Sequence, residues 1–216
     1  MTINFSLIKL NDAIIMGSDT FTYFMSKKTG FIQKYVLFTD INTCINFSGV
    51  AGIQGFDIFT YLDENFRSSI SEILNPLDIA KELKQRFTPL WRTLIQSIPS
   101  SILRNPRYNF NCKFDIGGFF DGKPKLASLN IENQTIEQVQ YTISCPEIVK
   151  QLFRTYGDRI LQPSLNTVEG YIDHVRTTIS NGIEYDKRIM GNNVTSGGKI
   201  NIIIIRLNSI EETQNI

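Results

Sequence analysis

The stretch TINFSLIKLNDAIIMGSD, positions 2–19, decides the fold. Within it, Thr2–Lys9 places Ile, Phe and Leu on one side of an extended chain and mainly polar residues on the other, which predicts a β-strand with one buried face. An Asn-Asp pair then supplies turn chemistry, and the apolar run Ala13–Met16 predicts a second strand that ends at Gly-Ser-Asp. We therefore expect a β-hairpin that returns Asp19 to the start of the chain.

After this hairpin, the spacing of apolar residues predicts further strands in some segments and helices in others. Short apolar or alternating runs predict further strands at Tyr35–Phe38, Thr43–Phe47, Asn109–Phe120, Pro124–Asn130, about Ile136–Ser144 and Ile200–Leu207. Helical spacing covers about Phe56–Ile73, Leu77–Ile98, Pro146–Ile160 and Thr167–Asn181. Pro89 should kink the second helix or divide it, and the polar end NSIEETQNI should fray.

This order of strands, two helices, strands, two helices and a strand predicts an α+β fold. Two antiparallel sheets would pack face to face with helices on both outer sides, which gives a four-layer αββα sandwich. The 216 residues are enough for one domain with such a core. We therefore expect a single domain over residues 1–216.

Composition and charge exclude several classes of partner and site. The 22 Lys and Arg nearly balance the 21 Asp and Glu, so neither nucleic acid nor a membrane surface is an expected partner. Three cysteines without a C-x-x-C pair and a single histidine predict reduced thiols, and neither a metal site nor a cofactor. No signal-peptide pattern opens the chain, and the longest aliphatic run, INIIIIRL, is too short to span a bilayer, so we expect a soluble cytoplasmic protein.

Six features follow one another in a distinctive order: a hydroxylated residue at position 2, Asp19 at the hairpin end, a basic residue in IQKYVLF, the turn FSGVAG, the strand block FDIGGFFDGKPKLASLN and a late TSGGKINIII. Together they resemble the proteasome β-subunit family, including its simpler bacterial ring-forming relatives, over nearly the whole chain. Each fragment alone is weak, and the specificity lies in order and spacing.

The resemblance implies the N-terminal nucleophile (Ntn) hydrolase fold and a threonine-type endopeptidase. Such enzymes enclose their active sites within rings, so a homo-oligomer is expected. Its substrates would be peptides or unfolded proteins, and an ATP-dependent unfoldase is a candidate partner.

Thr2 is the nucleophile that this resemblance implies. A threonine hydroxyl needs a base, and a free α-amine with a pKa of about 7.7–8.0 can serve its own residue in that role. Thr2 has such an amine only after the removal of Met1, which is usual before a small residue. The alternative interpretation is an ordinary threonine at the start of a strand.

The resemblance places Lys34 beside the nucleophile, where a cation would lower the pKa of the hydroxyl and of the α-amine. Lys27 and Lys28 are alternatives, but they precede a Thr-Gly pair typical of a surface turn. Asp19 matches the aspartate that keeps this lysine charged and oriented. Its separation from the chain start is one residue longer than the family pattern, and if the register slips there, Ser18 takes its place.

Gly49, in SGVAG, matches the residue whose backbone N–H stabilises the oxyanion, although a plain turn glycine would have the same pattern. Ser144, Asn193 and Ser196 match positions that complete a hydrogen-bond network around the threonine amine. Two departures occur here: ISCP replaces a glycine-flanked serine, and Asn193 replaces a common aspartate, which keeps the hydrogen bonds but loses the charge.

Other candidate residues and functions stay open. His174 lies beside the apolar stripe of its helix and should face solvent, and Cys145 has no base near it in sequence, so neither is expected to act in catalysis. A catalytically silent ring subunit would share the fold without the chemistry. A small-amide hydrolase would share the nucleophile but not the substrate.

Overall fold

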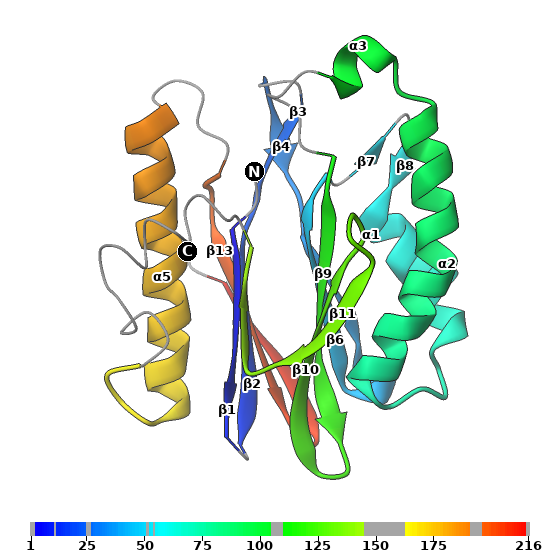
Figure 1. Ribbon diagram of the computed structural model, residues 1–216. Helices are drawn as coiled ribbons and strands as arrows, with labels where there is room; N and C mark the ends of the chain where they lie inside the picture. Colours follow the sequence, from blue (N-terminus) through cyan, green and yellow to red (C-terminus); the bar gives the residue numbers. More distant parts are fainter. Residues whose placement is uncertain are drawn as a thin grey trace.

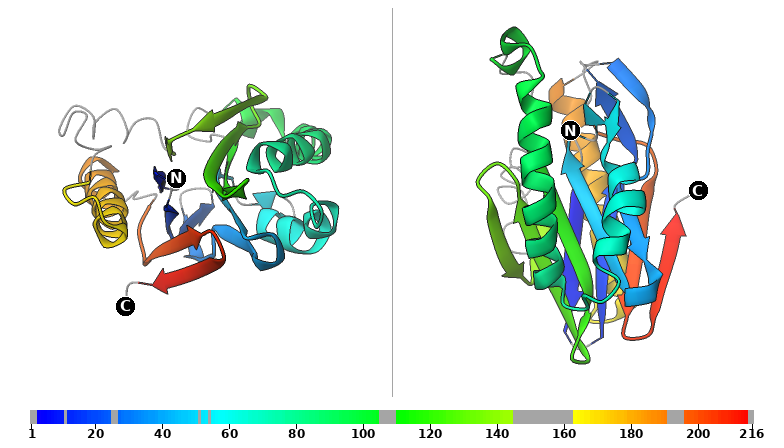
Figure 2. Two further views of the ribbon diagram at one scale, coloured as in Figure 1. Left: turned by 90° about the horizontal axis from the view of Figure 1, so that it is seen from below. Right: turned by 90° about the vertical axis from the view of Figure 1, so that its right-hand side faces the viewer.

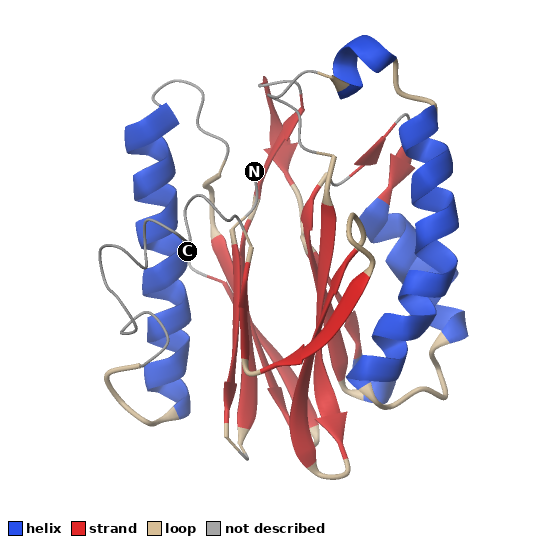
Figure 3. Cartoon of the chain, in the orientation of Figure 1, coloured by secondary structure: helices blue, strands red, loops and turns tan. Residues whose placement is uncertain are grey.

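The fold is α+β, with two five-stranded antiparallel sheets and helices outside them (Figures 1 and 3). A computed structural model describes residues 3–10, 12–24, 27–50, 52–53, 55–104, 110–144, 163–190 and 196–214. In this part of the chain, no helix combines the length and the apolar character that a membrane crossing needs.

The first sheet contains the hairpin predicted from positions 2–19. Its strand order is β12-β1-β2-β13-β14. The strands are β1 (Asn4–Lys9), β2 (Ala13–Asp19), β12 (Tyr141–Ile143), β13 (Ile200–Arg206) and β14 (Ser209–Gln214). The hairpin register pairs Asn4 with Ser18 and Lys9 with Ala13, so positions 10–12 form its connection. Asp12 closes this turn, because its N–H donates to the Lys9 carbonyl and its carboxylate pairs with the Lys9 ammonium at 2.7 Å.

The second sheet has the order β11-β10-β9-β6-β5. Its strands are β5 (Tyr35–Phe38), β6 (Thr43–Gly49), β9 (Cys112–Phe120), β10 (Lys123–Asn130) and β11 (Thr135–Val139). Two short hairpins complete the described strands, β3 (Phe21–Phe24) with β4 (Lys27–Phe31) and β7 (Gly52–Ile53) with β8 (Phe56–Asp57). The first of these was not predicted, and it places Lys27 and Lys28 in a strand rather than before a turn.

The described helices are α1 (Ile58–Thr60), followed without a break by a π-helical segment (Tyr61–Phe66) and a 3₁₀ turn (Arg67–Ser69), then α2 (Pro76–Gln96), α3 (Ser100–Leu103) and α5 (Val168–Met190). Asn75 caps α2, because its side-chain oxygen accepts the Leu77 N–H at 3.1 Å and Pro76 follows at the first helical position. The helix predicted at Pro146–Ile160 lies outside the described residues.

The layers run in the order α5, first sheet, second sheet, α2 (Figures 1 and 2). One apolar cluster joins α5 to the first sheet through Val175 and Ile179. A second cluster joins α2 to the second sheet through Leu83 and Phe87. A third fills part of the space between the sheets, where Met16 belongs to it. Each sheet is therefore covered on both faces.

Burial of both faces corrects the expectation for the first strand. Asn4 and Ser6, on the side predicted to be open, are both fully buried. The reason is the second sheet, which covers that side, whereas Phe5 on the other side packs with the α5 cluster.

Two further predictions about the elements are wrong, and a third is decided in part. Pro89 does not divide the second helix, since α2 continues to Gln96 and buries Phe87 and Trp91 on either side of the proline, while a kink there stays a prediction. The run 136–144 is not one strand, because β11 and β12 belong to different sheets. The polar end does not fray over Ser209–Gln214, which pairs along β13 as an edge strand.

The closeness of α5 to the first sheet gives a test of this packing. A Cβ atom added at Gly17 would lie 2.5 Å from Val175 Cγ1 and 2.6 Å from Ile179 Cδ1. We expect Gly17→Ala to lower the free energy of unfolding by about 1–3 kcal/mol, because the core has no room for the methyl group. In a Val175→Ala background the cost should shrink. Chemical denaturation of the four variants checks this, and an equal cost in both backgrounds would contradict the packing.

Candidate functional site

A buried ion pair joins the two sheets at the end of the predicted hairpin. Asp19 ends β2 in the first sheet, and Lys34 directly precedes β5 in the second. The Lys34 ammonium lies 2.9 Å from Asp19 Oδ1. The Asp19 side chain is fully buried and the Lys34 side chain is 2% exposed. The pairing expected from the sequence is therefore present, and it is shielded from water.

Backbone donors complete the surroundings of the Asp19 carboxylate. The Ile3 N–H donates to Oδ1 at 2.8 Å, and the Gly197 N–H donates to Oδ2 at 2.9 Å. The Asp19 N–H in turn donates to the Ile3 carbonyl at 3.1 Å. Charge-assisted hydrogen bonds of this kind offset the cost of burying a carboxylate. Asp19 thus holds together the start of the described chain, Lys34 and the segment that leads into β13.

The hairpin register settles which residue occupies this position. Ser18 pairs with Asn4 across β1 and β2, and Asp19 follows opposite Ile3. The alternative in which a register slip replaces Asp19 by Ser18 is therefore wrong. Lys34, not Lys27 or Lys28, forms the ion pair with Asp19.

Burial changes the acid strength of Lys34. Removal from water lowers its pKa below the ordinary value of 10.5, while the charge of Asp19 and its hydrogen bond oppose that change. Burial is the larger of these causes. A lysine with a lowered pKa can exchange a proton with a neighbouring hydroxyl or amine more readily than a surface lysine.

Ser144 lies on the other side of the chain start. It directly follows β12, and its hydroxyl oxygen accepts the Asn4 N–H at 2.6 Å. The Ser144 N–H donates to the Asn4 carbonyl at 2.9 Å. The Ile3 backbone is therefore hydrogen-bonded to Asp19, and the backbone of the next residue, Asn4, is hydrogen-bonded to Ser144. These bonds hold the start of the described chain on both sides.

Ser196 is buried and bound to Asp186, a residue that the sequence reasoning missed. The Ser196 N–H and hydroxyl donate to Asp186 Oδ2 at 2.7 Å and 2.6 Å. Ser196 directly precedes Gly197, whose N–H donates to Asp19. Asp186, which is 2% exposed, therefore supplies a carboxylate to the segment that supports Asp19. The signal was available in the sequence, since Asp186 continues the spacing of Ile179 and Ile183 along one buried helix face.

Gly49, the last residue of β6, has a backbone conformation that favours glycine. Its φ is +98°, and a Cβ atom there would lie 1.9 Å from the Asn111 carbonyl oxygen. The residue is exposed, and it lies two positions after Phe47, whose N–H donates to the Lys34 carbonyl at 2.9 Å. The close approach of Asn111 is by itself a sufficient reason for a glycine at this position. The role of the Gly49 N–H in stabilising an oxyanion therefore stays a prediction.

Several candidates differ from the expectation or fall outside the description. Thr2, Asn193 and Cys145 lie outside the described residues. The ring of His174 does not face solvent freely, because it is half-buried and contacts the Phe5 ring at a centroid distance of 5.9 Å.

The two described cysteines, Cys44 and Cys112, are buried free thiols, and burial raises the pKa of both. A thiol with a raised pKa is rarely ionised, so neither side chain is suited to act as a nucleophile.

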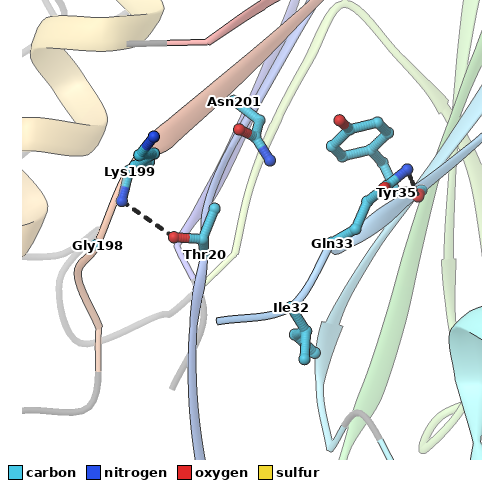
Figure 4. Close-up of a pocket in the computed structure, with 7 residues that line it drawn as sticks. All are labelled: Thr20, Ile32, Gln33, Tyr35, Gly198, Lys199 and Asn201. Atoms are coloured by element: carbon cyan, nitrogen blue, oxygen red, sulfur yellow. Dashed lines mark hydrogen bonds between the residues drawn. The ribbon is translucent and has the colours of Figure 1, made fainter. Parts of the chain in front are cut away.

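A pocket of about 600 Å³ adjoins the ion pair (Figure 4). Its described lining includes Thr20, which follows Asp19, and Gln33 and Tyr35, which flank Lys34 in the chain. It also includes Gly198 and Lys199 from the segment after α5. Two of the segments that meet at Asp19, those of Lys34 and Gly197, therefore form walls of the pocket together with the residue that follows Asp19.

Known proteins do not identify this arrangement. No protein-family model matches the chain, and no curated protein matches its sequence. The assignment of a function therefore rests on the residues and their geometry.

The lowered pKa of Lys34 predicts a particular dependence of stability on pH. The unfolded chain binds this proton more tightly than the folded chain, so the wild type gains stability as pH rises toward 10.5 and loses it as pH falls. Compared with Lys34→Met, the free energy of unfolding of the wild type should rise as the pH approaches 10.5 from below, by at most about 1.4 kcal/mol per pH unit. Denaturation at each pH measures the difference.

The control for this experiment is Lys123→Met, which removes an exposed lysine from the start of β10 and reports the effect of net charge alone. A difference between wild type and Lys34→Met that stays constant or falls with rising pH would contradict the direction given for Lys34.

Loss of Asp186 should loosen the segment before β13. Asp186→Ala leaves the buried Ser196 donors without their acceptor, so we expect a loss of about 1–3 kcal/mol in the free energy of unfolding. Faster hydrogen exchange of the Ser196 and Gly197 amides should accompany it. Glu184→Ala, on the exposed side of α5, is the matched control and should change stability by less than about 0.5 kcal/mol. Equal effects of both variants would contradict the role of Asp186.

Proposed function

We propose that this chain is a threonine-type endopeptidase of the Ntn hydrolase class, in which Thr2 becomes the nucleophile after removal of Met1. The observation that carries the proposal is the buried Lys34–Asp19 ion pair, whose carboxylate also accepts the Ile3 N–H at 2.8 Å. Ile3 directly follows Thr2 in the chain. The bond between Ile3 and Asp19 therefore ties the residue after the proposed nucleophile to the proposed activating pair.

The architecture supports the same proposal. Two antiparallel sheets that pack face to face, with α5 on one outer side and α2 on the other, fit the four-layer αββα sandwich of Ntn hydrolases (Figure 1). Fold alone does not determine chemistry, because the same layers can serve a silent subunit. The argument for an enzyme comes from the charges buried at one end of those layers, where burial without function costs stability.

In the proposed reaction, the Thr2 hydroxyl gives its proton to the free α-amine, and Oγ attacks the carbonyl carbon of the scissile peptide bond. A C–O bond forms, and the carbonyl oxygen becomes an oxyanion that the Gly49 N–H would stabilise. The C–N bond then breaks as the leaving amine takes up the proton, which leaves an ester on Thr2. Water hydrolyses this ester, releases a carboxylic acid and restores the hydroxyl.

Lys34 and Asp19 have distinct parts in this proposal. A Lys34 ammonium close to the hydroxyl would lower the pKa of that group, and its own lowered pKa would let it exchange the proton more readily than a surface lysine. Asp19 would orient Lys34 while its other oxygen holds the Gly197 N–H. No cofactor takes part in the proposed steps.

Ser144, Ser196 and Asn193 would surround the threonine amine. Two of these, Ser144 and Ser196, are buried, and Ser144 holds Asn4, which lies two positions after Thr2. The carboxylate of Asp186 on Ser196 offers the negative charge that Asn193 lacks. We further propose a homo-oligomeric ring that encloses the sites and admits unfolded proteins or peptides, with an unfoldase as a candidate partner. A monomer in light scattering would contradict the ring.

A threonine-directed epoxyketone or β-lactone probe tests the nucleophile. The mature chain should lose Met1 and gain the mass of one probe molecule on Thr2, measured by intact-mass and peptide mass spectrometry. Thr2→Ala should abolish the adduct. Lys34→Met should slow its formation by about 10²–10⁴-fold, because the hydroxyl loses its activating neighbour.

Thr39→Ala, which removes an exposed hydroxyl outside the site, is the matched control and should react at the wild-type rate. Retention of Met1, or a chain without a Thr2-dependent adduct, would overturn the enzyme proposal and favour the silent ring subunit.

A further inference from the structure

The pocket beside the ion pair contains a buried polar side chain without a partner. Asn201, in β13, is 6% exposed, and its side-chain amide forms no hydrogen bond with another described residue. Figure 4 shows this amide directed into the pocket, across from Tyr35. Neither amide atom is among the fully buried unpartnered atoms, so the amide reaches the space of the pocket and is available to a ligand with a complementary polar group.

Thr20 adds a second donor from the same wall, since it directly follows β2, which pairs with β13. Its hydroxyl oxygen accepts the Lys199 N–H at 3.0 Å, which leaves the hydroxyl hydrogen available to a ligand. Thr20 is 8% exposed and directly follows Asp19. A group bound between Thr20 and Asn201 would therefore lie close to the Lys34–Asp19 pair.

The charge of the pocket lining favours a ligand of opposite charge. Among its described lining residues, Lys199 carries the only charge, and it forms none of the ion pairs between described residues. Ile32 and Tyr35 supply apolar surface, because the Tyr35 hydroxyl donates outward to Glu212 on β14. The Thr20 and Asn201 donors, the Lys199 cation and the apolar surface together match an acidic side chain, in which one or two methylene groups carry a carboxylate.

We infer that this pocket binds an acidic side chain, glutamate or aspartate, of the peptide substrate, near the bond to be cleaved. This inference rests on the proposed peptidase function and adds its specificity. The carboxylate would accept hydrogen bonds from Thr20 and Asn201 and pair with the Lys199 ammonium. The volume of about 600 Å³ admits a glutamate side chain together with adjoining main-chain atoms.

The test uses peptides that differ at one position, as Glu, Gln or Lys, with cleavage followed by mass spectrometry. The wild type should cleave the Glu peptide with a kcat/KM about tenfold higher than the Gln peptide and higher still than the Lys peptide. Lys199→Glu should reverse the order. Lys123→Glu makes the same charge change at the start of β10, outside the pocket, and should leave the order unchanged. Asn201→Ala should weaken the Glu preference.

A binding measurement separates failure of this inference from failure of the proposed function. Fluorescence anisotropy with Thr2→Ala and a labelled Glu peptide needs no catalysis, and Lys199→Glu in that background should raise the Kd about tenfold, whereas Lys123→Glu should not. Binding of this kind without any Thr2-dependent cleavage would overturn only the peptidase. Cleavage without an acidic preference, or equal effects of Lys199→Glu and Lys123→Glu, would overturn the assignment of the pocket.

Discussion

The ion pair between Lys34 and Asp19 is the contact on which the rest of the site depends. Two opposite charges out of water are stable only when their remaining hydrogen-bonding capacity is satisfied. Here the carboxylate is satisfied by Ile3, Lys34 and Gly197, which come from three separate parts of the chain. The charge requirement therefore fixes where the chain start, the residue before β5 and the segment before β13 must meet.

The space between the sheets changes character toward that meeting point. One part is apolar and contains Ile14, Met16 and Ile203. Nearer the ion pair, Asn4 and Ser18 pair across β1 and β2, and each buries a side-chain oxygen without a partner among the described residues. Asn4 also donates across the gap to the Phe47 carbonyl at 3.0 Å. Polar burial of this kind lowers stability, so its presence beside a pair of charges fits the proposed functional region.

The support of the site is arranged in layers outward from Asp19. Ser196 and Gly197 adjoin in the chain, and α5 holds the first of them through Asp186, while the apolar face of the same helix packs on β2 and β13. The packing of α5 on the first sheet and the position of Ser196 and Gly197 are thus coupled. The pocket opens beside these supported segments, where Asn201 belongs to β13 and Thr20 directly follows β2, the strand paired with it.

Local patterns by themselves determined the hairpin of β1 and β2, most strand positions and the α2 stripe, because periodicity and turn residues act over short distances. The choice of Asp19 and Lys34 came from the resemblance to the proteasome β-subunit family. Contacts distant in sequence were decided only by the tertiary structure. The edge strand Ser209–Gln214 forms because β13 offers it an open edge, and Pro89 is accommodated because α2 is packed along its length. Asp186 joined the site only when α5 continued past Asn181 and met Ser196. A polar residue gains its role from the partner that folding brings to it, and one sequence carries no local trace of that partner.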